Sequence, residues 1–213
     1  MMWVAAGSAV WSGSAAARSL QSVTAPDCVA IGKPKPLAGY TYELSQSTGA
    51  NSQFTSYWEE VSEKSSRVRI ARANGTTVQA NEHHIADDAL LLDKTSQFTA
   101  TGTVVGTTVF QPGMVGDTGF RACAGRSWPI PSVTASYQSG QTKASTSTPA
   151  GTLRVVAIHE KITVPAGTFD TVHYIRTSQS TDEYWKSIEQ GVVVKHVGTL
   201  PNAVVTETLI SIK

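Results

Sequence analysis

The chain has 213 residues, of which 40% are hydrophobic and only 15% are charged, and its formal net charge is +1. This length fits one domain, with or without an export segment. The scattered Lys and Arg residues exclude the basic surface of a nucleic-acid-binding protein. The sequence has no run of about 20 apolar residues, so no transmembrane segment is expected.

The N-terminal residues look like an export signal. Residues 1–17 contain no charged side chain and end in Ala15-Ala16-Ala17, which satisfies the small-x-small rule of a signal-peptidase site. A positively charged start is missing, so 1–17 is interpreted as a partial signal peptide, either because the signal is incomplete or because its start lies upstream. A disordered tail is the alternative. We then expect an N-terminal extension over 18–36, a single domain over 37–213, and a periplasmic or secreted protein.

The chain has two cysteines, Cys28 and Cys123. In an oxidising compartment, a widely spaced pair can form a disulfide, whereas in the cytosol two buried thiols would be the default. No C-x-x-C motif is present, which disfavours a zinc ribbon or a thioredoxin-type redox site. With the export signal, the pair predicts a disulfide that ties the start of the domain to its middle.

Polar and apolar residues alternate along most of the chain, and β-branched and aromatic residues are frequent, which predicts strands. Tyr40 and Tyr42 share one face of the first strand, and Phe54 and Trp58 share one face of the second. Asn74-Gly75 then separates two strand-like runs and is a strong hairpin signal.

The next segment, 82–93, predicts either one short helix or a loop that enters a strand. On a helix, His83 would face Asp87 and His84 would face Asp88, which could form half of a metal site. A metal-dependent hydrolase is therefore one alternative function. A metal site needs three or four ligands, and the others are not visible in the sequence, so we expect no metal and no cofactor.

The middle of the chain is less regular. Residues 97–110 suggest two short strands, and Gln111 to Pro131 reads as a Gly- and Pro-rich loop that Cys123 could hold in place. Val133 to Tyr137 predicts a further strand. The Ser- and Thr-rich tract from Gln138 to Gly151 reads as an exposed connection.

The last sixty residues give the clearest strands: Leu153–Val164, Thr168–Ser178, Glu183–Lys186, Val192–Val197 and Val204–Ile212. No alternation of strands and helices occurs, which excludes a parallel sheet. The predicted fold is all-β and mainly antiparallel, with about ten strands and at most one or two short helices.

Three segments carry a resemblance: Val164-Pro165-Ala166-Gly167-Thr168-Phe169-Asp170-Thr171, Glu183-Tyr184-Trp185 and Gly191-Val192-Val193-Val194-Lys195. They resemble uncharacterised bacterial envelope families with a V-P-A-G-T-(F/Y)-(D/E) turn, which are similar in fold to the lipoprotein carriers LolA and LolB. The resemblance covers residues 160–210. It implies a half-barrel, in which an antiparallel sheet curls around an apolar cavity, and it transfers no catalytic residue.

Three histidines, His159, His173 and His196, fall on neighbouring predicted strands. The hairpin register that best gathers the apolar residues pairs Val164 with Phe169 and places His159 and His173 on different faces. A three-histidine metal site is therefore not expected. In this register, His173 lies opposite Glu160 and could form a cross-strand charge pair.

Five aromatic residues could point to one side of a curved sheet: Tyr40, Tyr42, Phe54, Trp58 and Trp185. They would either fill the core or line a cavity for an apolar ligand. We predict an exported, non-enzymatic domain that binds a hydrophobic or lipid-like ligand with these residues. The alternative is a structural or interaction module of an envelope complex, in which an exposed edge strand pairs with a partner protein.

Overall fold

The computed structural model describes residues 27–200 and 202–213. The expected signal peptide at 1–17 lies outside the described residues, as do 18–26 of the expected extension. All regular structure in the described part is β-strand, and every strand pairing is antiparallel, as predicted. The described residues contain no helix, which agrees with the expectation of at most one or two short helices.

The described strands are, in chain order, β1 (Cys28–Ala30), β2 (Gly39–Gln46), β3 (Asn51–Val61), β4 (Ser65–Arg72), β5 (Thr77–Ala86), β6 (Ala89–Phe98), β7 (Val104–Thr118), β8 (Arg121–Cys123), β9 (Ser127–Ile130), β10 (Val133–Ser139), β11 (Thr142–Thr148), β12 (Gly151–Val164), β13 (Gly167–Thr177), β14 (Thr181–Ser187), β15 (Val193–Leu200) and β16 (Ala203–Ile212).

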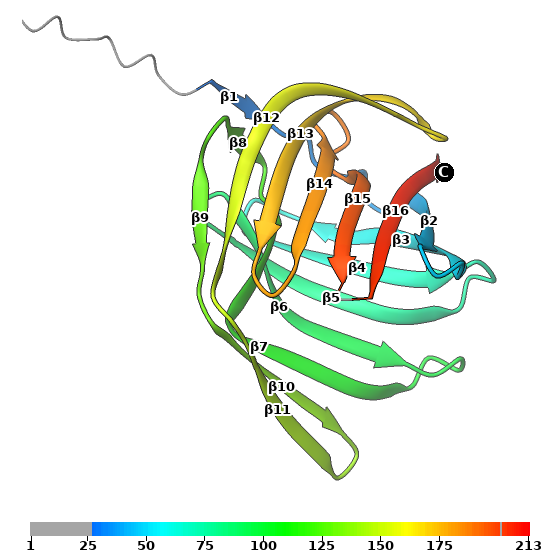
Figure 1. Cartoon of the computed structure of the whole chain (residues 1–213). Coiled ribbons are helices and arrows are strands. Elements are labelled where there is room, and N and C mark those ends of the chain that lie inside the picture. Colours follow the sequence, from blue (N-terminus) through cyan, green and yellow to red (C-terminus); the bar gives the residue numbers. More distant parts are fainter. Residues whose placement is uncertain (1–26, 201) are drawn as a thin grey trace, which may run out of the picture.

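Fourteen of these strands form one large sheet in the order β11-β10-β7-β6-β5-β4-β3-β2-β16-β15-β14-β13-β12-β9, and β1 pairs with β8 in a separate ribbon. The sheet curls strongly (Figure 1), but its edge strands β9 and β11 do not pair with each other. The expectation of about ten strands is therefore too low, and the half-barrel is an open, curled sheet of fourteen.

Two segments that were predicted to be loops contain strands. The β7 strand continues through the predicted loop to Thr118, and β8 and β9 follow within it. The loop interpretation failed because Pro112 and Gly113 only interrupt the pairing with β6, where the register shifts between Leu92 and Lys94. A bulge absorbs a proline that cannot donate to the ladder. The Ser- and Thr-rich tract forms the β10–β11 hairpin, which is exposed as expected.

Residues 82–93 form a hairpin between β5 and β6, so the predicted helix is wrong. Asp87 and Asp88 connect the two strands, with φ angles of 50° and 62°. A two-residue turn with two left-handed residues matches the twist of paired strands, and Asp tolerates this conformation. The hairpin signal at Asn74-Gly75 is confirmed, since Gly75 lies between β4 and β5 with a φ of 82°.

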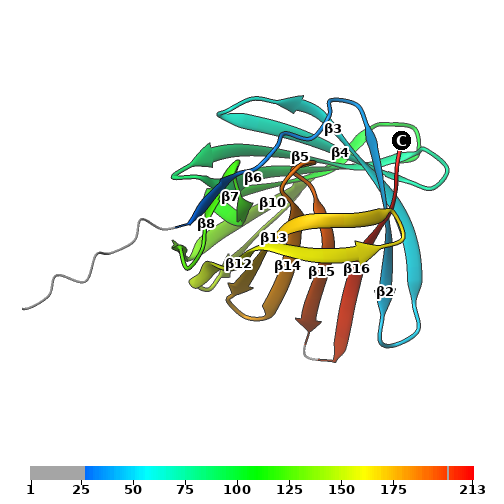
Figure 2. The same cartoon turned by 90° about the horizontal axis from the view of Figure 1, so that it is seen from above.

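The β12–β13 hairpin has a different register from the one predicted. Val164 pairs with Gly167 because the turn contains only Pro165 and Ala166, and two irregularities in β12 then shift the pairing further. The hairpin bends over the end of the curled sheet (Figures 1 and 2). There the Ala166 N–H donates to the carbonyl of Leu209 in β16, at 3.3 Å.

The first hydrophobic cluster lies in the hollow of the curled sheet. It joins Ala89 and Val115 of β6 and β7 to Val155, Val172 and Tyr174 of β12 and β13. These strands are far apart in the order of the sheet, so their side chains meet only across its concave side. The hollow is therefore packed with side chains where these strands face each other.

The predicted disulfide between Cys28 and Cys123 is confirmed. The two cysteines are directly paired residues of β1 and β8. Val29 and Ala122, which follow and precede them, pack in or against the first hydrophobic cluster. The disulfide thus fastens the first described strand to the core.

Candidate functional site

Four of the five predicted aromatic residues share a face of the sheet. Tyr42 pairs with Phe54 across β2 and β3 and stacks on it with ring centroids 5.2 Å apart. Tyr40 and Tyr42 are buried and belong to a second hydrophobic cluster, against which Phe54 and Trp58 pack. Their observed contacts are those of core residues.

Trp185 is a buried member of the same cluster, although it points to the other face of β14, so the five aromatic residues gather in one cluster without all pointing to one side. Trp185 pairs with Lys195, whereas its neighbour Tyr184 shares the face of Tyr42 through the ladder of β14, β15, β16 and β2. The alternation of side chains along a strand fixes this difference. The indole N–H of Trp185 donates to Glu160 Oε1 at 3.0 Å.

The three histidines do not converge. His173 stacks on Trp185 and lies between Glu160 and Glu183, each 3.1 Å away, so the predicted contact of His173 with Glu160 is present. His159 occupies an irregular position in β12, with a φ of 61°, and contacts Asp170. His196 lies on the opposite face of the sheet from His173.

The candidate metal half-site is also dispersed. His83 shares a face with Ser66 and is largely buried, which lowers its pKa. His84 points to the other face and contacts Asp93 at 2.7 Å, while Asp88 binds Arg126 at 2.6 Å. Among the residues that the structure describes, no group of three or more His, Cys, Asp or Glu side chains is placed to hold a metal ion.

A polar cluster that was not expected from the sequence lies on the concave face. Tyr174, Tyr184 and His196 stack in a row across β13, β14 and β15, with ring centroids 4.9 and 4.3 Å apart. Glu207 follows in β16, with its carboxylate 3.7 Å from His196. Burial raises the pKa of both tyrosines, so their hydroxyls remain neutral.

Ion pairs connect the stacked rings to the charged residues beside them. Asp182 contacts Arg176 at 3.0 Å and His196 at 3.4 Å. Burial alone would raise the pKa of Asp182, but these two contacts outweigh it and lower the pKa. Burial would likewise lower the pKa of His196, and its contacts with Asp182 and Glu207 raise it instead.

Lys186 extends the cluster across the hollow. Its Nζ, on β14, lies 2.9 Å from Asp117 Oδ2 and donates to the carbonyls of Thr118 and Gly119 at 2.6 and 3.0 Å. All three ammonium hydrogens can therefore be used. Each charge in the cluster has a partner, so this part of the hollow is an ionic core and not the apolar cavity predicted from the sequence.

A signal for this cluster is present in the sequence. Arg176, Asp182, Tyr184 and Lys186 occupy alternate positions of consecutive strands, so they share a face once the register of β13 and β14 is known. The sequence alone does not determine this register, so the cluster could not be identified from it.

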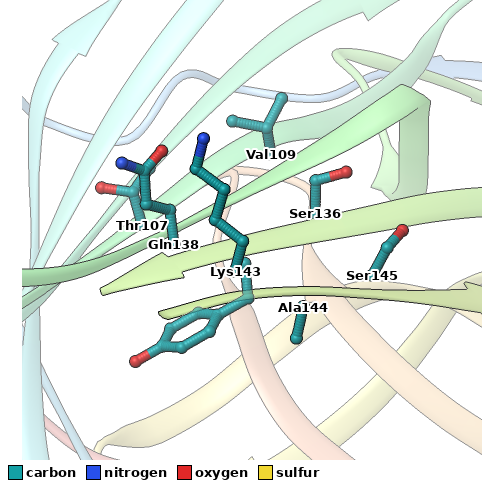
Figure 3. A pocket seen from close by; sticks show the side chains of 8 residues that line it. Thr107, Val109, Ser136, Gln138, Lys143, Ala144 and Ser145 are labelled. Carbon is teal, nitrogen blue, oxygen red and sulfur yellow. The ribbon is translucent and has the colours of Figure 1, made fainter. Parts of the chain in front are cut away.

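An open groove lies instead on the part of the sheet formed by β7, β10 and β11 (Figure 3). It has a volume of about 450 Å³ and is lined by Thr107 and Val109 of β7, Ser136 and Gln138 of β10, and Lys143 and Ser145 of β11, among others. In Figure 3 these six side chains reach the same side of the strands, while Ala144 points away.

The groove continues toward the hairpin tips. A second hollow of about 390 Å³ is lined by Val104, Val105 and Gly140, among others, and shares Thr107 and Gln138 with the first. Val104, Val105 and Val109 are 52%, 43% and 37% exposed, respectively. These exposed valines lie among hydroxyl and amide side chains, and none of the five predicted aromatic residues lines either hollow.

The described residues contain no helix that is long and apolar enough to cross a membrane. No protein-family model matches the sequence, and no curated protein is significantly similar to it.

Three solved structures match this chain in part. A Bacteroides fragilis protein that is thought to be exported and has a YmcC-like fold matches with a TM-score of 0.51 at 11% identity, over 87% of this chain and 100% of that chain. A candidate lipoprotein from Parabacteroides distasonis gives a TM-score of 0.49 at 12% identity, over 88% and 100%. The hypothetical lipoprotein YmcC from Escherichia coli gives 0.39 at 11%, over 83% and 85%. The first match shows that this chain shares the fold of a YmcC-like protein, and it shows the fold alone.

Proposed function

We propose that this protein is an exported, non-enzymatic domain of the cell envelope that binds a hydrophobic or lipid-like ligand. The observation that carries the proposal is the groove on β7, β10 and β11, with exposed valines at its floor and end. Exposed apolar side chains that gather in one hollow mark a binding surface more often than scattered ones do.

An envelope location is supported by two observations. The disulfide between Cys28 and Cys123 is typical of oxidising compartments such as the periplasm. The Bacteroides fragilis protein that shares the fold is thought to be exported.

The chemistry of the groove favours an apolar chain over a charged ligand. Lys143 is its one charged lining residue, and the other polar groups are hydroxyls and one amide. Binding would come mainly from apolar burial, at about 25 cal/mol per Å², so affinity should depend on chain length more than on the headgroup.

The test is a titration with a fluorescent fatty-acid probe. Val109→Ser should weaken binding about fivefold, because it removes about 1 kcal/mol of apolar contact. Val204→Ser is the matched control, since this valine of β16 is comparably exposed and does not line the groove.

Two results would contradict the proposal. One is a wild-type protein that binds no apolar probe. The other is binding that Trp58→Phe weakens while Val109→Ser leaves it unchanged, which would return the ligand to the aromatic residues of the concave face.

A second candidate function, an interaction module, is favoured by the open edge of the sheet. The hollow holds a packed core and an ionic cluster, while β11 leaves one side of its backbone unpaired. An unpaired edge is a template for another strand.

A further inference from the structure

The two edges of the large sheet differ in how they are protected. The β9 edge has four residues, includes Pro129 and is half buried. The β11 edge has seven residues, from Thr142 to Thr148, and six of them are exposed. It contains no proline, and its ladder with β10 runs without a bulge.

Natural proteins usually blunt an exposed edge with charges, prolines or bulges, because an unprotected edge pairs with other chains. In β11, Lys143 is the one charged residue, and the strand has no proline or bulge to prevent such pairing. A long, regular and almost uncharged edge therefore indicates that another strand pairs with it.

The geometry of the hairpin shows which groups are available. The turn consists of Gly140 and Gln141, so Ser139 and Thr142 form the hydrogen-bonded pair that closes a two-residue hairpin. Hydrogen-bonded and non-hydrogen-bonded pairs alternate in an antiparallel ladder. Lys143, Ser145 and Ser147 therefore direct their N–H and C=O groups away from β10.

We infer that β11 pairs with β11 of a second copy of this chain, antiparallel and around a twofold axis at Ser145. In this register Ser145 pairs with its own equivalent, and Lys143 pairs with Ser147 in both directions. Every outward backbone group of these three residues finds a partner, and each pair exchanges both of its hydrogen bonds.

The side chains fit the same register. Ala144 lies opposite Thr146, and Thr142 lies opposite Thr148, so small and hydroxyl side chains meet throughout. Cross-strand Thr pairs are favourable, and no two charges are directly opposed. The two lysines lie four residues apart along the ladder, about 14 Å, which salt screens.

The shape of the molecule permits this contact. The β10–β11 hairpin projects from the rest of the sheet (Figure 1), so a second copy can approach its edge. The resulting interface is isologous and closes on itself, as twofold dimers do. It deepens the second candidate function. Lys143 and Ser145 also line the groove, but the pairing uses their backbone groups and not their side chains.

The test begins with sedimentation velocity of the wild-type protein from about 1 to 300 μM. A small interface of this kind predicts a weak dimer, with a dissociation constant in the micromolar range, on the order of 10 μM. Ser145→Pro should raise this constant at least tenfold, because proline removes an N–H that only the dimer uses and edge strands tolerate proline.

Ser145→Lys should have the same effect, since it opposes two lysines across the axis. Ser52→Lys adds the same charge to an exposed residue of β3, away from this edge, and should leave the dimer unchanged. Thermal melts of all variants establish that the fold is retained.

Cysteine cross-linking tests the register. The residues of a hydrogen-bonded pair are about 5.5 Å apart at Cα, which allows a disulfide. Ser145→Cys should therefore cross-link two chains on oxidation, whereas Lys143→Cys should not. The native cysteines do not interfere because they are bonded to each other.

A wild-type protein that stays monomeric over the whole range would overturn the inference, including one that accepts an added strand-forming peptide at this edge. A dimer that both Ser145 variants leave intact would do so too, as would equal cross-linking at both engineered cysteines. The Val109→Ser titration reports on the ligand separately, so failure of one proposal does not imply failure of the other.

Discussion

Replacing Lys186 with methionine tests whether the ionic cluster holds the two sides of the curled sheet together. The side chain of Lys186 is 1% exposed, and that of its partner Asp117 is 14% exposed. Lys186→Met keeps most of the length of the side chain and removes the charge. It leaves the Asp117 carboxylate without its cation and two backbone carbonyls without their donor.

Breaking a buried ion pair by removing one partner costs about 3–5 kcal/mol. Asp117 retains some contact with solvent, so we expect a loss of about 3 kcal/mol, at the lower end of this range. For a domain of this size, the melting temperature should fall by about 6–12 °C. Urea denaturation followed by tryptophan fluorescence would measure the free energy, with Lys64→Met as an exposed-lysine control.

A double-mutant cycle separates the ion pair from the packing of the side chain. Adding Asp117→Asn to Lys186→Met removes the unpaired charge and should recover about 1 kcal/mol or more, whereas Asp117→Asn alone should destabilise the protein. The reasoning fails if Lys186→Met costs less than about 0.5 kcal/mol, or if Asp117→Asn has the same effect in both backgrounds.

Two further predictions concern stability. Changing Cys28 and Cys123 to Ser should lower the free energy of unfolding by about 4 kcal/mol, since the bond spans 95 residues; chemical denaturation with and without reductant measures this, and a loss below about 1 kcal/mol would contradict it. The raised pKa of His196 gives a stabilising contribution that is complete below about pH 6.5 and is lost as the pH rises through the folded-state pKa. His196→Gln should remove this decline in melts between pH 5 and 9, and an identical pH profile in both proteins would refute the assignment.

Local signals predicted the features of the fold that depend on neighbouring residues. The turn at Asn74-Gly75 needs a left-handed residue, and Gly75 provides it, so the hairpin could be predicted from this dipeptide. The disulfide followed from an even cysteine count and an export-like start.

Register was harder to predict because it depends on turn length. The hairpin after Val164 closes with two residues and not four, which moves Phe169 opposite Ile162. From the sequence, Asp87 and Asp88 are interpreted as part of a helix or a loop because they lack the glycine that marks most two-residue hairpin turns, yet both adopt left-handed angles and form the turn. At both turns, the conformation of the connecting residues follows from the pairing of the two flanking strands and not from their own preferences.

The concave cluster could not be predicted because it depends on curvature. Lys186 and Asp117 are distant in sequence and belong to strands that do not pair, so only the curl of the sheet brings them together. The same curl brings residues of β6 and β7 against those of β12 and β13. This is why charged residues that look exposed in an alternating pattern become part of a core.

The pairing of β2 with β16 has a consequence for the order in which the protein can fold. Gly39 and Lys213 exchange backbone hydrogen bonds of 3.1 and 2.9 Å, so the first strand of the large sheet and the end of the chain lie side by side at its centre. While the chain is being synthesised, β2 to β7 can pair in sequence, but β2 keeps an open edge until β16 has been made. The two halves of the sheet join only when β16 reaches β2, and such long-range closure makes folding slow.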